Sequence, residues 1–450
     1  MISIRSPGRE GEHSNVKIKA LAFVLTAALL LCGCGQKGET AAAAPAQAVT
    51  APAAQSGMAR PVSTGVTPEQ FGAKGDGIAD DLQALQAAMQ QASASGRPLE
   101  LTAGAVYRFS SCLGLSSGLT IRGNGAVLLS DIQYHDLKED RVAVELMKDS
   151  DDDRAHDVRL ENVTFRAADR CQANYMLRVM LARNVEFVGC TFDCEPNEWG
   201  RCAADLYGGN ENIRFEGCVF RQMTSGASGG IWVRNWTDRV ESRNIRFQNC
   251  EFYKSGADEL LAVWGWGGAV RDVVLSGCSF YETQTQEALD ADHCPAWFIT
   301  LGQSGTTDVR MEDCTVRAEY CETIFRMVGD KTRAVVDNCD ITMKQPDSMA
   351  EHDMKKGANP MLARGNDRAD GSTVIQNSRI TLSGDNGRRI CYQLSALKGN
   401  TLDVSLGCGI ASTKEVSGNT IRGRIRHKVF QDCSGVENNN VEVRRFSILG

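Results

Sequence analysis

The sequence predicts an all-β protein built as a parallel β-solenoid, and three observations support this prediction. A phrase of eight residues recurs seven times at spacings of 25 to 36 residues. The first and third residues of each phrase are apolar, which is the period of a strand buried on one face. The fifth residue is always Asn, Asp or Gly, the types that best tolerate a left-handed backbone. Two short strands that meet at such a bend bury little surface alone, so we expect the copies to stack on one another.

The copies share a bend residue followed by a small residue that we expect to face the core. They begin at Val158, Val185, Ile213, Ile245, Val273, Val309 and Ala334. Their bends fall on Asn162, Gly189, Gly217, Asn249, Gly277, Asp313 and Asn338. The next residue is Val163 in the first copy and Cys190, Cys218, Cys250, Cys278, Cys314 and Cys339 in the others. Weaker copies follow at 375–380, 416–421 and 436–443. Leucine-rich repeats have a similar period, but they would show a leucine ladder in a different frame.

Composition narrows the class of protein. The chain has 450 residues, of which 42% are hydrophobic, so it can bury a large core. Its 49 Lys and Arg residues against 56 Asp and Glu residues give a net charge of -7. Such a chain lacks the excess of positive charge that binds a phosphate backbone, so we expect no nucleic acid partner. The 44 glycines indicate many tight bends rather than long helices.

The N-terminal segment predicts export and a lipid anchor. Lys17 and Lys19 precede an apolar run over 20–31, which has the length of a signal-peptide core. The run ends in Leu-Cys-Gly-Cys, which resembles a bacterial lipobox with Cys34 as the lipidated residue. We therefore expect a signal peptide at 1–33, a flexible linker at 34–65 and a folded domain at 66–450. A plain secretory signal is the alternative.

A lipid anchor implies a location in the cell envelope. By analogy with bacterial sorting, Gly35 after the lipidated cysteine favours the outer membrane, on its periplasmic face or at the cell surface. The membrane is then a partner through the lipid, and we expect the domain itself to be a monomer.

A second motif follows the linker. Phe71–Gly77, which reads Phe-Gly-Ala-Lys-Gly-Asp-Gly, Asp80-Asp81 and Leu99–Tyr107 together resemble the opening signature of the pectate lyase and polygalacturonase superfamily. The resemblance implies a right-handed parallel β-helix whose first coil is closed by a helix. We expect this capping helix over 81–94, with Asp80 or Asp81 as its N-cap.

The 17 cysteines are many for an exported protein. Six of them belong to the repeated phrase, where a small thiol packs well, and we expect these to stay unbonded. Pairs in the loops, such as Cys294 with Cys321, are candidates for disulfides in an oxidising compartment. No Cys-x-x-Cys pair occurs, which argues against a zinc site.

The superfamily resemblance implies that a glycan binds along one parallel sheet. The strands that follow the bend phrases carry aromatic, acidic and arginine side chains suited to sugar rings, hydroxyls and carboxylates. The predicted substrate-binding residues are Asp205, Tyr207, Trp232, Arg234, Trp264, Trp266, Trp297 and Glu322. The alternative is that these are strand residues packed for stability.

Asp258 and Glu259 are the first catalytic candidates. Their placement before a strand resembles the paired carboxylates of polygalacturonases, although the family's Asn-Thr-Asp, Gly-His-Gly and Arg-Ile-Lys elements have no counterpart here. Asp292 and His293 lie in a loop at 281–295 that we expect to overhang the same surface, where His293 would serve as acid or base.

β-Elimination is the alternative chemistry to hydrolysis. It requires a base, for which Arg326 and Arg234 are candidates, and a cation that neutralises the uronate. Oxygen ligands that suit Ca²⁺ are present in Asp205, Asp258, Glu259 and Asp292.

The sequence therefore predicts an envelope-anchored protein that processes a polysaccharide, and uronic-acid polysaccharides are among the candidate substrates. It favours an enzyme that cleaves glycosidic bonds and leaves hydrolysis and elimination both open. The alternative is a non-catalytic glycan-binding or structural solenoid, because a fold alone does not establish an activity.

Overall fold

The computed structural model describes most of the predicted domain. The described residues are 65–133, 142–147, 153–194, 202–223, 230–235, 240–254, 259–282, 297–319, 323–344, 361–366, 370–383 and 389–445. The expected signal peptide, Cys34 and nearly all of the expected linker lie outside these ranges, as do Cys294 and Cys321. None of the helices in the described ranges combines the length and apolar character needed to cross a membrane.

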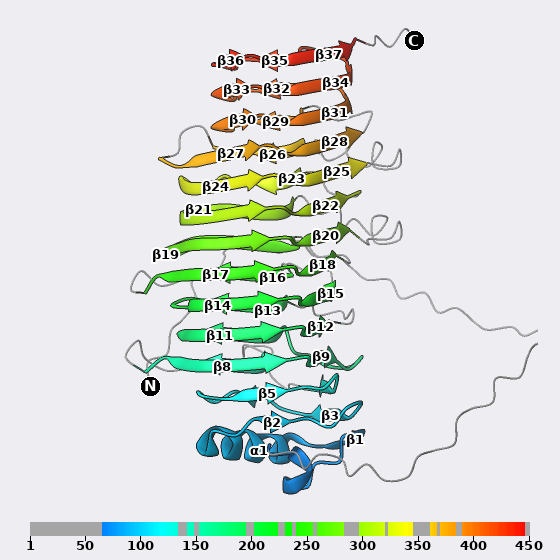
Figure 1. The fold of residues 1–450 in the computed structure, drawn as a ribbon, viewed down its shortest axis with the longest axis vertical. Helices are drawn as coiled ribbons and strands as arrows, with labels where there is room; N and C mark the ends of the chain where they lie inside the picture. The colour runs from blue at the N-terminus through cyan, green and yellow to red at the C-terminus, as the bar shows by residue number, and fades with distance from the viewer. Residues whose placement is uncertain are drawn as a thin grey trace, which may run out of the picture. The chain divides into compact units, whose positions relative to one another are not determined.

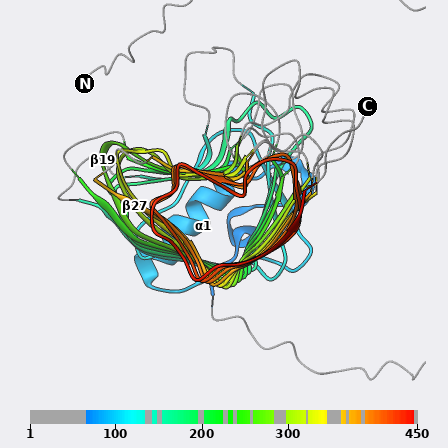
Figure 2. The same cartoon turned by 90° about the horizontal axis from the view of Figure 1, so that it is seen from above.

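The described chain is a right-handed parallel β-helix, which confirms the predicted fold class. Its strands form three faces, which we call sheets I, II and III, and every strand pairing is parallel. Figure 1 shows the strands stacked in chain order from β1 beside α1 to β37 at the other end. Viewed down the stack in Figure 2, the three sheets surround the core and α1 lies across the opening of the coils.

Each coil passes through sheets I, II and III in turn, as β7, β8 and β9 do. Sheet I contains β4 (Leu113–Gly114), β7 (Val142–Met147), β10 (Tyr175–Met180), β13 (Cys202–Tyr207), β16 (Ile231–Arg234), the first parts of β19 (Leu261–Ser276) and β21 (Trp297–Glu312), β23 (Thr323–Arg326), β26 (Met361–Arg364), β29 (Cys391–Tyr392), β32 (Ile410–Ala411) and β35 (Phe430–Gln431). Sheet II contains β2 (Leu99–Glu100), β5 (Thr120–Arg122), β8 (Ala155–Glu161), β11 (Ala182–Val188), β14 (Glu211–Glu216), β17 (Ser242–Gln248), the second parts of β19 and β21, β24 (Lys331–Asp337), β27 (Ser372–Gln376), β30 (Ala396–Lys398), β33 (Glu415–Ser417) and β36 (Val436–Glu437). Sheet III contains β1 (Asp76–Asp80), β3 (Val106–Phe109), β6 (Val127–Ser130), β9 (Thr164–Ala167), β12 (Thr191–Asp193), β15 (Val219–Met223), β18 (Glu251–Lys254), β20 (Ser279–Glu282), β22 (Thr315–Ala318), β25 (Asp340–Lys344), β28 (Arg379–Ser383), β31 (Thr401–Leu406), β34 (Thr420–Ile425) and β37 (Asn440–Arg444).

A capping helix closes the first coil, as expected, but Asp81 plays a different part. The 3-10 helix η1 (Pro68–Phe71) precedes α1, which spans Leu82–Ser95 and starts one residue later than predicted. The Asp81 carboxylate accepts the backbone N–H groups of Lys74 at 2.7 Å and Gly75 at 3.0 Å, while Asp80 accepts the N–H of Leu82 at 3.2 Å. Asp81, only 2% exposed, therefore ties the Gly-rich signature segment to the start of the helix rather than capping it with its side chain.

The seven predicted bends all adopt the left-handed conformation. Their φ angles lie between 51° at Asn338 and 62° at Gly277. The bends also stack, because the N–H of Gly189 donates to Glu216 O at 2.8 Å and that of Gly217 donates to Gln248 O at 2.9 Å. The repeated phrase thus turns the chain from sheet II into sheet III at the same position in each coil.

Replacing Gly217 tests this assignment. Its φ is 58°, and a Cβ added there would meet no atom within 4 Å. Replacements at this position should therefore differ in stability only through the backbone conformation that each residue prefers. We expect Gly217→Asn to be close to neutral and Gly217→Val to lower the free energy of unfolding by about 1–2 kcal/mol in urea titrations. Equal stability of the two variants would contradict a left-handed requirement.

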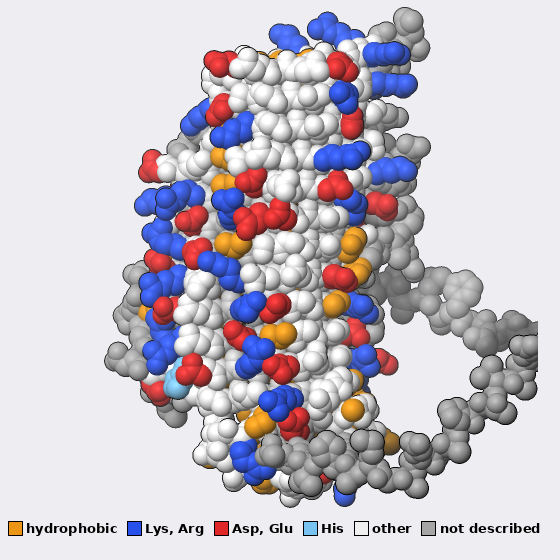
Figure 3. Space-filling view, viewed as in Figure 1, with side chains coloured by type: hydrophobic (Ala, Val, Ile, Leu, Met, Phe, Trp, Pro, Cys, Tyr) orange, Lys and Arg blue, Asp and Glu red, His pale blue; other side chains and the backbone are white. Residues whose placement is uncertain are grey.

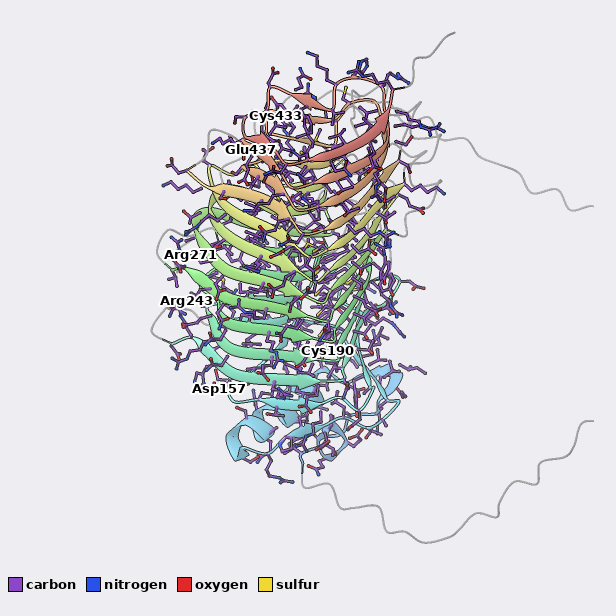
Figure 4. All side chains as sticks on the ribbon, turned by 45° about the horizontal axis from the view of Figure 1, so that its top comes forward. Asp157, Cys190, Arg243, Arg271, Cys433 and Glu437 are labelled. Atoms are coloured by element: carbon purple, nitrogen blue, oxygen red, sulfur yellow. The ribbon has the colours of Figure 1, made fainter. Side chains whose placement is uncertain are left out.

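A second ladder of left-handed residues was not predicted. Asp157, Asn184, Asn212, Asn244 and Asp272 have φ between 51° and 58°. The amide of Asn184 donates to Asp157 at 2.9 Å, and that of Asn212 donates to Asn184 at 2.9 Å. Figure 4 shows Asp157 on the same edge as Arg243 and Arg271. The signal was present in the sequence, since each ladder residue immediately precedes one of the first five phrases.

The core contains two phenylalanine stacks and a column of thiols. Phe165, Phe192, Phe220, Phe252 and Phe280 stack through sheet III with ring centroids 4.5 to 5.0 Å apart. Phe187, Phe215 and Phe247 stack beside them in sheet II. The six cysteines of the repeated phrase are at most 2% exposed and form no disulfide. Their thiols donate to backbone carbonyls, as Cys218 does to Phe187 O at 3.3 Å.

Candidate functional site

Strand register brings five of the eight predicted substrate-binding residues together on sheet I. Asp205 lies opposite Arg178 on one side and Trp232 on the other, and Tyr207 lies opposite Arg234. Arg234 in turn lies opposite Trp264. We call this group, with Tyr175 beside it, the aromatic–arginine cluster: Tyr175, Arg178, Asp205, Tyr207, Trp232, Arg234 and Trp264.

Asp205 holds the cluster together electrostatically. It is fully buried and accepts Nε and Nη2 of Arg234 at 2.7 and 2.8 Å, as well as Nε of Arg178 at 3.3 Å. Burial alone would lower the pKa of Arg234, but the hydrogen bonds and charge of Asp205 raise it above its ordinary value. Arg234 is therefore a poor base, and Asp205 acts as an anchor for two guanidinium groups.

The aromatic rings of the cluster pack against these guanidinium groups. Cζ of Arg178 lies 4.4 Å from the ring centroid of Tyr175, and Cζ of Arg234 lies 4.2 Å from that of Trp232. The rings of Trp232 and Trp264 are 5.4 Å apart. Because Trp232 is only 8% exposed, its ring contributes mainly to packing, whereas the half-buried Trp264 keeps part of its surface accessible.

Two polar atoms of the cluster lack partners. The Nε1 atoms of Trp232 and Trp264 are shielded from solvent, and neither donates to an acceptor among the residues that the structure describes. A buried donor without an acceptor costs about 1–3 kcal/mol, so the packing of the two indoles carries this cost in the described part of the chain.

A second group lies further along sheet I and contains Glu259, Trp297, Thr300 and Arg326. The hydroxyl of Thr300 donates to Oε1 of Glu259 at 2.7 Å, and Nη1 of Arg326 lies 3.6 Å from the same oxygen. Cζ of Arg326 is 4.5 Å from the ring centroid of Trp297. The buried Nε of Arg326 has no partner in the described part of the chain. We call this group the Glu259–Arg326 site.

Arg326 differs electrostatically from Arg234. Burial lowers the pKa of Arg326 and outweighs the opposing effect of Glu259, and the positive charge of Arg364 lowers it further. Arg364 faces Arg326 in register on the next strand of sheet I. Of the two arginines considered as bases, Arg326 is therefore the better suited.

Four predicted site residues lie outside the described ranges: Asp258, Asp292, His293 and Glu322. The backbone of Trp266 belongs to β19, but its side chain is likewise not described. Their proximity to the Glu259–Arg326 site stays a prediction.

The described residues do not make a fitting calcium site. No group of three or more His, Cys, Asp or Glu side chains within these ranges could hold a metal ion. Both oxygens of Asp205 accept hydrogen bonds from arginine, and Glu259 is bonded to Thr300 and paired with Arg326. The calcium prediction therefore rests on Asp258 and Asp292.

A groove of about 530 Å³ follows the unpredicted ladder on sheet II. Beside the ladder it is lined by charged side chains such as Arg159 and Arg246, in a region where Figure 3 shows both charges interspersed. These side chains pair locally, with Arg159 bonded to Glu161 at 2.6 Å and Arg246 to Asp272 at 2.6 Å. We assign the groove to solenoid stability, because sheet I instead carries the buried aromatic rings and the unpaired donors.

Comparison with known proteins supports the fold. Residues 66–279 match the family model described as Rhamnogalacturonase A/epimerase, pectate lyase-like. A search of curated proteins finds no match.

Similar solved structures include the surface adhesin PfbA of Streptococcus pneumoniae, with 13% identity and a TM-score of 0.50 over 85% of this chain and 100% of that one. The tailspike protein of E. coli bacteriophage HK620, solved with a pentasaccharide, has 12% identity and a TM-score of 0.44 over 84% and 80% of the two chains. ORF18 of Geobacillus virus E2 has 14% identity and a TM-score of 0.42 over 85% and 62%. At these identities the likeness concerns the fold alone.

Proposed function

From the premise that residues 66–279 form a pectate lyase-like β-helix, we propose that the protein binds a polysaccharide along sheet I and cleaves it at the Glu259–Arg326 site. The observation that carries this proposal is the alignment of aromatic, arginine and carboxylate side chains across successive coils of one sheet. A linear glycan lying across the coils would meet Trp264 and Trp297, whose half-buried rings suit sugar faces.

The chemistry that these residues favour is β-elimination of a uronic-acid polysaccharide. Neutral Arg326 would take the proton from C5 of the sugar, the electron pair would form the C4–C5 double bond, and the C4–oxygen bond would break. The departing oxygen would take a proton from solvent. Arg364, which faces Arg326, would neutralise the uronate carboxylate, and this neutralisation would make the C5 proton more acidic.

Replacing Arg326 tests this mechanism. We expect Arg326→Met to lower kcat on the best uronic-acid polysaccharide by about 10²–10⁴-fold, because it removes the base. Formation of unsaturated product is followed by ultraviolet absorbance. Because the rate depends on the neutral guanidine, wild-type activity should rise with pH toward the lowered pKa of Arg326.

Arg317→Met is the matched control, since Arg317 pairs with Asp340 on sheet III and we expect full activity from it. New reducing ends without unsaturated product, at equal rates in wild type and Arg326→Met, would instead indicate hydrolysis. That result would transfer the catalytic role to Glu259 with Asp258 or Asp292, and any calcium requirement would then be tested with a chelator.

A non-catalytic glycan-binding protein is the second candidate. The observation in its favour is that Asp205 and Glu259, the described carboxylates of the site, are both engaged by neighbouring side chains. PfbA, named as an adhesin, has the same fold. Measurable affinity with no product of either kind across uronic-acid and neutral polysaccharides would favour this candidate.

Export and lipidation belong to the same proposal. Attachment at Cys34 would place the β-helix in the cell envelope, where polysaccharides are accessible. Metabolic labelling with a fatty acid, lost in Cys34→Ala, would support the anchor, and secretion of unlabelled protein would contradict it.

A further inference from the structure

Sheet III carries a row of cationic and hydroxyl side chains toward the C-terminal end of the described solenoid. On the successive strands β25, β28, β31, β34 and β37, strand register places opposite one another Lys344, Ser383, Ser405, Arg424 and Arg444. We call these five residues the basic row. Because the strands are parallel and in register, the side chains leave the sheet on one side and follow the solenoid axis. Figure 3 shows Lys and Arg side chains gathered over β34 and β37, at the upper right of the view.

The basic row contains no carboxylate, which distinguishes it from the adjacent row of sheet III. Two residues earlier on the last two strands, Arg422 pairs with Glu442 at 3.4 Å. Arg424 instead lies opposite Arg444, and neither forms an ion pair within the described ranges. Like charges on neighbouring strands repel each other, so a bound anion would relieve this repulsion. Both arginines are exposed, and an anion can reach them without any rearrangement of the coils.

Ser383 and Ser405 add hydroxyl groups to the row. Both side chains are half-buried, and neither hydroxyl forms a hydrogen bond with a residue that the structure describes. A hydroxyl can donate to an anionic oxygen, and a guanidinium group can donate two parallel N–H groups to one carboxylate. The row therefore presents donors along its whole length, and its excess charge is positive.

The shape of the row suits a linear ligand better than a flat surface. Neighbouring strands lie about 4.8 Å apart, so the four steps of the row cover about 19 Å along the axis. The row is one side chain wide, because Asp403 and Glu442 lie two residues away on β31 and β37. An anionic lipid surface would approach these carboxylates as well, whereas a single polymer chain would meet the row alone.

We propose that the basic row binds a linear anionic polysaccharide, whose carboxylate or sulfate groups are held by Arg424 and Arg444. The row lies on a different sheet from the Glu259–Arg326 site, so it would retain the polymer without taking part in its cleavage. The inference shares with the proposed function the class of ligand, but it does not require any reaction on sheet I.

Calorimetric titration of the full-length protein at low ionic strength tests this site. All proteins carry Arg326→Met, so that the polymer is not cleaved during the measurement. The probes are polygalacturonate for carboxylates and dextran sulfate for sulfates, with uncharged dextran as the control polymer. We expect Arg424→Gln/Arg444→Gln to weaken binding of at least one anionic polymer about tenfold, equivalent to about 1.4 kcal/mol for two surface ion pairs. Added salt should weaken the binding further.

Arg317→Gln/Arg422→Gln is the matched control for this variant. It also removes two positive charges from sheet III, but its arginines are paired with Asp340 and Glu442. We expect its affinity to equal that of the parent protein. An equal loss of affinity in the two double variants would indicate a general effect of net charge and would overturn the inference.

Chemical modification of arginines locates the site. In the Arg326→Met protein, the bound polymer should slow the reaction of phenylglyoxal with Arg424 and Arg444 and leave that of Arg183, exposed on sheet II, unchanged. Vesicles of phosphatidylglycerol distinguish a lipid surface from a polysaccharide. If such vesicles shielded the two arginines and neither anionic polymer did, the row would belong to a membrane contact and the inference would be wrong.

The inference and the proposed function fail separately. Unsaturated product from the wild-type protein, with Arg424 and Arg444 unshielded by either anionic polymer, would overturn the inference and leave the proposed function standing. Shielding of both arginines, with no product of either kind from the wild-type protein, would support the inference and count against cleavage on sheet I.

Discussion

Asp205→Asn should destabilise the β-helix by about 3 kcal/mol. The carboxylate is fully buried and accepts three arginine N–H groups, and removing one partner of a buried ion pair leaves uncompensated charge. In Asp205→Asn, two guanidinium groups would face an amide that is itself a donor on one side. The effect is measured as a shift of the urea unfolding midpoint with an unchanged slope.

Asp340→Asn is the matched control for this variant. Asp340 pairs with Arg317 at 2.7 Å, but its side chain is 51% exposed, so solvent screens the pair. We expect a change of at most about 1 kcal/mol. Similar shifts for the two variants would show that Asp205 does not anchor the cluster. Glycan affinity should fall only in Asp205→Asn, because the tryptophans lose their positioning.

Phe220→Ala should have an effect at least as large. Phe220 is fully buried, and its ring stacks on Phe192 at 4.9 Å and on Phe252 at 5.0 Å. Truncation leaves a cavity between two coils, and such changes cost about 3–5 kcal/mol. Thermal or urea unfolding measures the loss.

Tyr281→Ala on sheet III provides the comparison. The ring of Tyr281 stacks on Tyr253 at 5.1 Å but remains partly exposed, so its loss leaves no enclosed cavity. We expect a clearly smaller effect than that of Phe220→Ala. If Tyr281→Ala destabilised the protein equally, the internal stack would not be the main source of cohesion between coils.

Much of the fold was predictable because each copy of the repeated phrase requires a left-handed residue at its bend. A left-handed bend accepts few residue types, so Asn162 and Gly189 reveal it in the sequence. The coil at β30 and β31 was not predicted, although its bend at Gly399, with φ of 65°, follows the same pattern as the predicted weaker copy at 416–421. There Asn400 takes the position of the inward cysteine and donates to Ile375 O at 3.0 Å.

The site was less predictable, because the role of a charged side chain depends on its partners in neighbouring coils. The choice of Asp205 and Arg234 as surface residues followed from strand spacing, but their mutual burial did not, since the two are 29 residues apart in the chain. Likewise, nothing local in the sequence separates Arg326 from Arg234 as a base. The difference comes from the bidentate carboxylate beside Arg234 and the like charge beside Arg326.

The two ends of the described solenoid differ, and this difference bears on how it responds to heat. α1 buries Leu85, Ala88 and Met89 over the first coil, whereas Val436 and Val441 in the last described strands are 41% and 38% exposed. In a linear stack each coil is held mainly by its nearest neighbours. On heating, α1 should therefore protect the coils that lie nearest to it, so that the sheet I residues on β10 to β16 keep their arrangement longer than they would without this helix.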